Sequence, residues 1–409
     1  MTPLEGSLHQ LFIIMLVAML TPMIADYIPR IRIPVVVIEV MLGITIGPDL
    51  LDLVKLNPDI EALSALGLAF LFFLAGYEID FDRVKGHPLK LALKGWTIGL
   101  AIALAFGGLL QATGQADSLL YVGIAIATTT IGTLIPILSD EGVLESHFGT
   151  HTLAVGAVGE FGPIILIALL LDPDRGGVAS ALVLNAFFLV VIAGIIIARQ
   201  WRSHRLANLI ARTMDTSGQF AVRIAMFLVI GLVYAAEVLE LEFLLGAFAA
   251  GIIVGQAMKR VPLEHESELE LTRSKFDAIG YGFLIPVFFI VTGIQFQLKT
   301  LLDSPSSLAL VPVFLIFFRI VRGLPTIFLH REVLPAKSDR RALALLAGTE
   351  LPLVIAVTAL GVEAGRMSVE LATAMVGAAM ISVLIYPILG MAVRKSGAMH
   401  APEAVATGD

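Results

Sequence analysis

One acidic residue lies inside a stretch that is otherwise apolar enough to cross a membrane. Glu160 stands within residues 153–171, whose other members are almost all apolar residues or glycine. A charged side chain at the centre of a bilayer costs at least about 2.5 kcal/mol, so an ionisable residue there is by default a functional one. Burial disfavours the ionised carboxylate and brings its proton affinity closer to neutral pH. We therefore expect Glu160 to exchange a proton or hold a cation, the alternative being a structural pair with an arginine.

Other charged residues fall at membrane depth too. Arg319 and Arg322 are three residues apart within Phe317-Phe-Arg-Ile-Val-Arg-Gly-Leu-Pro325, which places them on one helical face. Arginine stays protonated in proteins, so either residue can neutralise an acid but cannot carry a transported proton. One of the two has the simpler alternative of reaching the membrane surface with its charged end. Glu350 offers a second acid.

Three consecutive threonines, Thr128 to Thr130, lie in another apolar stretch. Their hydroxyl and carbonyl oxygens are hard ligands of the kind that alkali cations accept. Threonine hydroxyls also bond back to their own helix, so a binding role and a local structural role are both open. We expect Glu160 and Thr129 as cation ligands, with Thr130 beside them.

The composition places the whole chain in a membrane. Hydrophobic residues make up 57% of the 409, charged residues only 15%, and the mean hydropathy is +0.92. Soluble domains average about 25% charged residues, so this chain is too apolar for that class. The net charge of -7 argues against nucleic-acid binding, which needs a clustered basic face. The absence of cysteine excludes disulfides and thiolate metal sites.

A helix needs about 20 mostly apolar residues to cross a bilayer. Thirteen ranges meet this requirement: 8–28, 33–51, 59–79, 89–113, 118–138, 149–171, 177–199, 217–237, 240–258, 276–297, 306–329, 340–361 and 367–392. We predict an all-α polytopic membrane protein of about thirteen transmembrane helices. Its transmembrane domain covers 1–395 and a short cytoplasmic tail covers 396–409.

The distribution of basic residues gives an orientation. Most of the 27 Lys and Arg residues fall in alternate loops of the predicted topology. Basic loops stay on the cytoplasmic side, so we expect the amino terminus outside and the carboxyl terminus inside.

Two of the predicted helices are interrupted near their middle. Ile124-Ala-Ile-Ala-Thr-Thr-Thr-Ile-Gly-Thr-Leu-Ile-Pro136 and Leu345-Leu-Ala-Gly-Thr-Glu-Leu-Pro-Leu353 both place Gly and Thr before Leu and Pro. Proline breaks the helical hydrogen-bond pattern, and backbone groups freed at this depth must be buried in protein or line a cavity. The two helices are seven apart and so run in opposite directions. Interrupted helices in corresponding positions of two inverted halves mark the binding site of a transporter.

The chain resembles the second family of monovalent cation:proton antiporters, which includes the Kef-type and related sodium/proton exchangers. The resemblance rests on Ile33-Pro-Val-Val-Val-Ile-Glu-Val-Met-Leu-Gly-Ile-Thr-Ile-Gly-Pro48, Phe70-Leu-Phe-Phe-Leu-Ala-Gly-Tyr-Glu-Ile-Asp80 and Pro286-Val-Phe-Phe-Ile-Val-Thr-Gly293 in this order. It implies an inverted-repeat fold with two crossed discontinuous helices, matched by those at 118–138 and 340–361. It also implies a homodimer whose protomers have a dimerisation part and a six-helix core that moves against it.

The resemblance implies roles for individual residues as well. The helix at 149–171 matches the one that carries the cation-binding carboxylate, so Glu160 takes that role. Arg322 is preferred as the basic residue near the carboxylate, with Arg319 as the second choice. Relatives place two polar residues side by side at the carboxylate, whereas this chain has Gly159 and Glu160. A single exchanging carboxylate implies electroneutral one-for-one exchange, unless Glu350 acts as a second acid.

We therefore expect a secondary antiporter that exchanges Na+ or K+ for H+ across a prokaryotic-type inner membrane. The alternatives are a non-exchanging channel or an ion or pH sensor on the same scaffold, and an organic-anion carrier in which Arg322 binds the anion. The sequence lacks the phosphate loops, zinc-binding helices and nucleophile elbows of common enzyme families. We expect no enzymatic activity and no cofactor.

Overall fold

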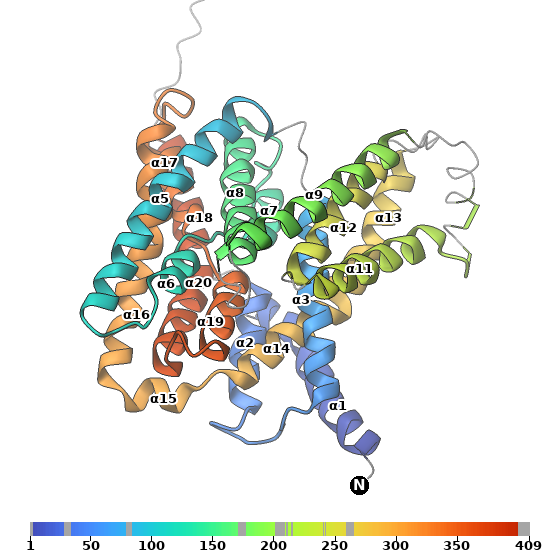
Figure 1. The fold of residues 1–409 in the computed structure, drawn as a ribbon, viewed down its shortest axis with the longest axis horizontal. Coiled ribbons are helices and arrows are strands. Elements are labelled where there is room, and N and C mark those ends of the chain that lie inside the picture. Colours follow the sequence, from blue (N-terminus) through green and yellow to red (C-terminus); the bar gives the residue numbers. More distant parts are fainter. Residues whose placement is uncertain are drawn as a thin grey trace, which may run out of the picture. The chain divides into compact units, whose positions relative to one another are not determined.

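The computed structural model describes residues 3–27, 34–78, 84–170, 177–200, 209, 212–213, 216–239, 241, 243–258 and 266–399. Helices joined by short connections make up these ranges (Figure 1). Among the described residues, nine helices are long and apolar enough to cross a membrane, and three apolar helices are shorter. Each of the thirteen predicted ranges contains a helix, so the all-helical membrane fold is confirmed. The count of thirteen is approximate because some ranges hold two shorter helices. Residues 400–409 of the predicted tail lie outside the described residues, and 396–399 continue the last helix.

The chain divides into two compact units, each made of two segments of the sequence. The first unit comprises residues 1–80 and 164–299. Its helices are α1 (Pro3–Tyr27), α2 (Val35–Ile46), α3 (Pro58–Glu78), α9 (Gly177–Gln200), α11 (Phe220–Val238), α12 (Phe243–Met258), α13 (Glu266–Ile279), the π-helical turn η1 (Gly280–Leu284) and α14 (Ile285–Gln295). Within this unit α3 packs on α12, and α14 packs on α2 and α3.

Glycine allows the backbones of α3 and α12 to approach closely. A Cβ atom at Gly251 would lie 2.1 Å from the carbonyl oxygen of Phe73, and one at Gly76 would lie 2.3 Å from that of Phe248. Neither position has room for a side chain. Small residues at helix contacts are typical of membrane proteins, where close backbone packing replaces the hydrophobic effect.

The second unit comprises residues 81–163 and 300–409. Its first segment holds α5 (His87–Ala112), α6 (Leu119–Ile126), α7 (Ile131–Asp140) and most of α8 (His147–Leu170). Its second segment holds the end of α15 (Leu298–Asp303), α16 (Pro305–Phe318), the π-helical turn η2 (Arg319–Gly323), α17 (Leu324–Leu329), α18 (Lys337–Ala347), α19 (Pro352–Glu363) and α20 (Val369–Met399).

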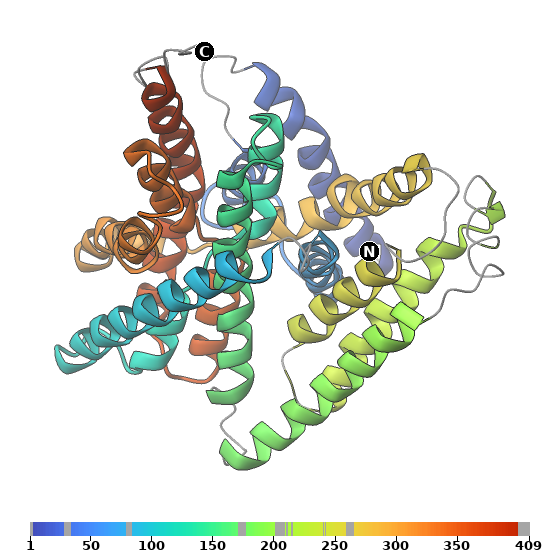
Figure 2. The ribbon, with the colours of Figure 1, turned by 90° about the horizontal axis from the view of Figure 1, so that it is seen from above.

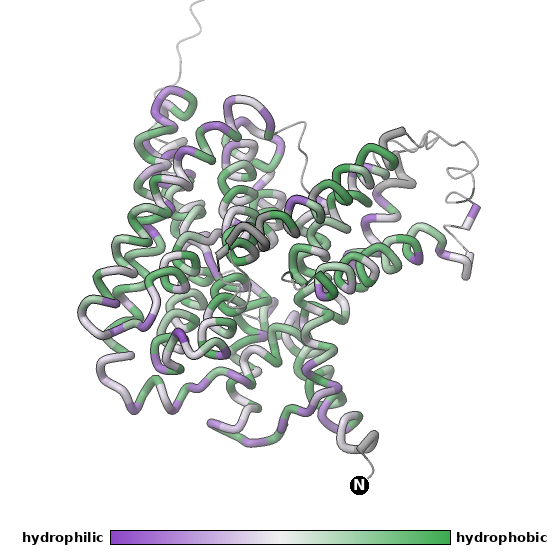
Figure 3. Tube along the Cα trace, in the orientation of Figure 1, coloured by the Kyte–Doolittle hydropathy of each residue, from purple (hydrophilic) through white to green (hydrophobic). Residues whose placement is uncertain are grey.

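The two segments of the second unit repeat one pattern, in which an interrupted helix stands between two continuous ones. The first has α5, the pair α6 and α7, and α8; the second has the α16–α17 helix, the pair α18 and α19, and α20 (Figure 2). α6 packs on α5 and α19, and α20 packs on α16, α18 and α19. Hydrophobic residues run along these helices, and hydrophilic residues gather mostly at their ends (Figure 3). The predicted pair of interrupted helices in an inverted repeat is therefore confirmed.

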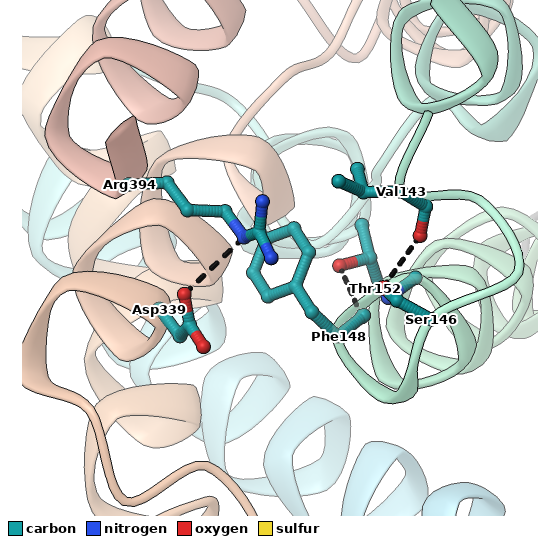
Figure 4. A network of polar contacts seen from close by, with 7 residues as sticks. Val143, Ser146, Phe148, Thr152, Asp339 and Arg394 are labelled. Carbon is teal, nitrogen blue, oxygen red and sulfur yellow. Dashed lines mark hydrogen bonds and ion pairs between the residues drawn. The ribbon is translucent and has the colours of Figure 1, made fainter. Parts of the chain in front are cut away.

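Polar contacts tie the beginning of α8 to the second segment of the unit. Arg394 of α20 contacts Asp339 of α18 at 3.2 Å, and its guanidinium lies 4.7 Å from the ring centroid of Phe148 (Figure 4). One turn along α8, the hydroxyl of Thr152 donates to the carbonyl oxygen of Phe148 at 2.9 Å. The first turn of α8 thus contacts α20 through Phe148, and α20 in turn contacts α18.

A buried histidine pair lies in the same unit. The rings of His151 on α8 and His330, which directly follows α17, are 5.2 Å apart between centroids. His330 is fully buried, and its Nδ1 donates to the carbonyl oxygen of Thr326 at 3.1 Å. Burial lowers the pKa of His330 to about 4; the hydrogen bond to Thr326 opposes this shift and the charge of His87 adds to it.

Gly251→Ala tests the close contact between α3 and α12. The added methyl group must push the two backbones apart, so we expect a loss of about 1–3 kcal/mol of stability, seen as a lower Tm of the purified protein in detergent. Gly231→Ala on α11 is the matched control, because a Cβ there meets no atom within 4 Å. An equal Tm for both variants would show that the glycine contact is unimportant.

His330 predicts a pH dependence of stability. Because its folded-state pKa lies below the value of about 6.5 for an unperturbed histidine, the unfolded chain binds more protons between these two pH values. The stabilisation from neutral His330 is complete above pH 6.5 and declines as the pH falls toward 4. We expect Tm to fall over this range, and His330→Gln to make the fall shallower. His9→Gln, at an exposed position on α1, should leave the slope unchanged; an unchanged slope in His330→Gln would contradict the assignment.

Candidate functional site

The two interrupted helices meet at their breaks. α6 ends at Ile126 and α7 begins at Ile131, whereas α18 ends at Ala347 and α19 begins at Pro352. The backbone N–H of Thr130 donates to the carbonyl oxygen of Thr349 at 2.9 Å. Helix ends leave backbone groups without intrahelical partners, and here each broken helix supplies partners for the other.

Threonine side chains complete this crossing. The Thr130 hydroxyl accepts the N–H of Leu351 at 3.1 Å, and the Thr129 hydroxyl donates to the carbonyl oxygen of Ala347 at 2.6 Å. Thr128 instead bonds back to Ala125 within its own segment at 3.0 Å. Of the three threonines, the two predicted as site residues are those that join the breaks, and all three are buried.

Glu160 lies directly at this crossing. Its side chain is only 3% exposed, and Oε2 accepts the backbone N–H of Ile131, the first residue of α7, at 3.0 Å. The N-terminus of a helix carries a partial positive charge from its unpaired N–H groups, which favours a carboxylate. A carboxylate in this place is held by the backbone N–H of Ile131, and its oxygens can still take up a proton or a cation.

Arg322 is the buried member of the predicted arginine pair. It lies in the π-helical turn η2 and is 2% exposed, whereas Arg319 is exposed. Its Nε donates to the hydroxyl of Thr129 at 2.7 Å, and its Nη2 donates to the carbonyl oxygen of Val155 on α8 at 3.0 Å. A π-helical turn shifts the register of the residues that follow it and frequently occurs at functional sites. Here it carries the guanidinium that reaches both the first break and α8.

Glu350 is placed in the second break by its backbone. Its N–H donates to the Ser382 hydroxyl at 3.0 Å, and that hydroxyl lies 3.1 Å from its carbonyl oxygen. The side chain is fully buried, and its carboxylate oxygens have no hydrogen bond of ordinary geometry among the described residues, although Thr128 lies close enough to interact with it. Glu350 and Arg322 attract each other electrostatically.

The structure therefore brings together most of the predicted site residues. Glu160, Thr129, Thr130, Arg322 and Glu350 all contact the crossing or one another in the second unit. The backbone of Arg319 lies beside the crossing in space, because its nitrogen is 3.3 Å from where a Cβ at Gly348 would be. Its exposed side chain separates it from the buried set.

Some residues of the crossing were missed by sequence reasoning. The indole N–H of Trp96 on α5 donates to the carbonyl oxygen of Ala127 at 3.0 Å, which satisfies one carbonyl freed by the first break. A tryptophan within an apolar helix needs an acceptor for its N–H, and this need was a usable signal. Ser382 has no such signal, because serines in membrane helices commonly bond to their own backbone.

The arrangement combines two buried acids with one permanent cation. Arg322 keeps its charge near neutral pH. If one ionised carboxylate balances the charge of Arg322, the other acid has no fixed positive charge to balance it. That acid then becomes neutral by binding a proton or a cation. This chemistry suits exchange between the two ligands.

Comparison with known proteins agrees with this description. The sequence profile of the family described as "Sodium/hydrogen exchanger, transmembrane" matches residues 15–392. The chain is 28% identical over 93% of its length to "Putative Na(+)/H(+) antiporter YjbQ" of Bacillus subtilis and spans 62% of that protein. It is 24% identical over 94% of its length to "Probable Na(+)/H(+) antiporter 3" of Methanocaldococcus jannaschii, of which it covers 96%.

A solved structure shares the fold. The sodium proton antiporter MjNhaP1 from Methanocaldococcus jannaschii at pH 8 superposes with a TM-score of 0.66, covering 96% of this chain and 99% of that one at 14% identity. The profile match extends over nearly the whole chain and includes every residue of the crossing. The chain therefore belongs to the sodium/hydrogen exchanger transmembrane family.

Proposed function

We propose that the chain is a secondary antiporter that exchanges a monovalent cation, Na+ or K+, for H+ by alternating access at Glu160. The observation that carries the proposal is a buried carboxylate bound to the first N–H of a half-helix, at the crossing of two interrupted helices. Family membership and the names of the relatives support antiport of this kind.

The proposed cycle needs one ligand at a time on Glu160. With the site open to one side, the carboxylate binds a cation; with the site open to the other, the cation leaves and a proton takes its place. The ionised carboxylate does not cross the membrane empty, because an uncompensated charge in the apolar interior is costly. This cost couples the movement of the cation in one direction to the movement of the proton in the other. The hydroxyl of Thr129 and the nearby backbone carbonyls complete the set of candidate ligands.

Arg322 and Glu350 form the fixed part of the charge balance in this proposal. Arg322 cannot release a proton. Burial of Glu350 favours its neutral form, and the positive charge of Arg322 opposes this by favouring the ionised form. We propose that Glu350 stays ionised beside Arg322 throughout the cycle. Only Glu160 then changes its ligand. One cation is exchanged for one proton, and the exchange moves no net charge.

The membrane location, orientation and oligomeric state that we propose rest on the family and on the distribution of basic residues. We propose a multi-pass protein of the inner membrane, with the amino terminus outside and the carboxyl terminus in the cytoplasm. This orientation rests on the distribution of lysine and arginine over the loops. A homodimer is expected from the resemblance to the antiporters. Crosslinking in membranes and labelling of single introduced cysteines test these two points, because the chain has none of its own.

Glu160→Gln tests the carboxylate as the carrier. The variant keeps the size of the side chain but cannot bind a cation or release a proton near neutral pH. In liposomes that contain a pH dye and hold a proton gradient, we expect added Na+, K+ or Li+ to move protons through the native protein. Glu160→Gln should respond no more than empty liposomes do. An unchanged Tm confirms that the variant is folded, and retained exchange would contradict the proposal.

Glu350→Gln tests the charge balance. We expect native exchange to be the same with and without a potassium–valinomycin voltage clamp, because no net charge moves. Glu350→Gln should slow exchange, since Arg322 then lacks its balancing charge. The remaining exchange should still be the same with and without the clamp. Clamp-dependent exchange in the native protein that becomes clamp-independent in Glu350→Gln would show that Glu350 carries a second proton.

A further inference from the structure

The room for the Arg322 guanidinium depends on a missing side chain in α8. Gly159 directly precedes Glu160, and a Cβ atom built on it would lie 2.2 Å from Nη2 of Arg322. The same atom would lie 2.6 Å from both Cβ and Oγ1 of Thr129. Real Cβ contacts are never this short, so any other residue at 159 would displace Arg322, Thr129 or both.

Gly159 differs from the glycines that bring helices together. At Gly76 and Gly251 the atom that excludes a Cβ is a backbone carbonyl oxygen of the neighbouring helix. At Gly159 the excluding atoms belong to the side chains of Arg322 and Thr129. The glycine thus makes space for functional groups and not for a passing backbone.

Hydrogen bonds around Gly159 fix the guanidinium in this space. Arg322 Nη2 donates to the carbonyl oxygen of Val155, the residue one helical turn before Gly159, and Nε donates to the Thr129 hydroxyl. The N–H of Thr129 in turn donates to the carbonyl oxygen of Gly159 at 3.0 Å. One turn of α8, the first break and η2 therefore meet at this residue.

We propose that Gly159 is a positioning residue of the exchange site: its lack of a side chain lets Arg322 lie against α8 between Thr129 and Val155 as a permanently bound internal cation. This inference rests on the proposed function, because it assigns Arg322 a fixed place beside the exchanging carboxylate. It also explains how the site works with one acid on α8. The space next to Glu160 holds a tethered positive charge in place of a second polar side chain.

A double-mutant cycle tests the proposal. Gly159→Ala should lower the rate of cation–proton exchange by at least about tenfold, the effect of losing one charge-assisted hydrogen bond. Arg322→Lys keeps the charge but lacks Nη2, the atom nearest to the added methyl group. We expect Gly159→Ala to cost much less in the Arg322→Lys background than in the native one, because the main clash has been removed.

Two controls separate positioning from helix packing. Alanine is the better helix former, so Gly108→Ala on α5, where a Cβ meets no atom within 4 Å, should leave the rate and Tm unchanged or slightly improved. If glycine at 159 served only helix packing, Gly159→Ala would cost the same factor in both backgrounds, within about twofold. That result would overturn the proposal.

The Tm values of the four proteins give a readout that does not need transport. We expect Gly159→Ala to lower Tm in the native background and to lower it less beside Arg322→Lys. If the native protein shows no exchange, the proposed function is wrong. The Tm values of the four proteins still test the role of Gly159 in that case. If Gly159→Ala fails to fold, folding of the double variant supports the proposal and failure of both contradicts it.

Discussion

The site depends on the pairing of backbone groups that two broken helices leave inside the membrane. An unpaired N–H or C=O in an apolar environment costs several kcal/mol, so the breaks at 127–130 and 348–351 persist only if each freed group finds a partner. Thr130 and Thr349 bond across the crossing, Trp96 takes a carbonyl of the first break, and Ser382 holds Glu350 in the second. Glu160 is one of these partners, because its carboxylate accepts the first N–H of α7.

This constraint links structure to mechanism. A carboxylate that caps a half-helix is held in place by a backbone N–H, here that of Ile131. Its second ligand can then change between a proton and a cation while the backbone contact remains. Arg322 is bonded instead to Thr129 and Val155 and interacts electrostatically with Glu350. Arg322 and Glu160 are thus held by different hydrogen bonds, which supports the one-for-one exchange that we propose.

Much of this organisation could be predicted from the sequence, for physical reasons. Apolar length gives the helices, and Gly, Thr and Pro in the middle of two apolar ranges give the breaks, because few other residue types tolerate such positions. Glu160, Glu350 and Arg322 were identifiable because charge inside a membrane is rare and costly. Contacts between distant segments could not be predicted: the bond from Trp96 to Ala127, the capture of Arg322 by Val155, and the space at Gly159 all arise from tertiary packing. Gly159 looked like a missing ligand in the sequence, whereas the structure shows its space occupied by Arg322.

The central claim is that one carboxylate holds either a proton or a cation. Calorimetric titration of the purified protein with Na+ or K+, in two buffers with different ionisation enthalpies, counts the protons released for each cation bound. The account predicts about one proton per cation at a pH where the site is protonated, and neither cation binding nor proton release in Glu160→Gln. Cation binding without proton release, or release that survives in Glu160→Gln, would contradict it.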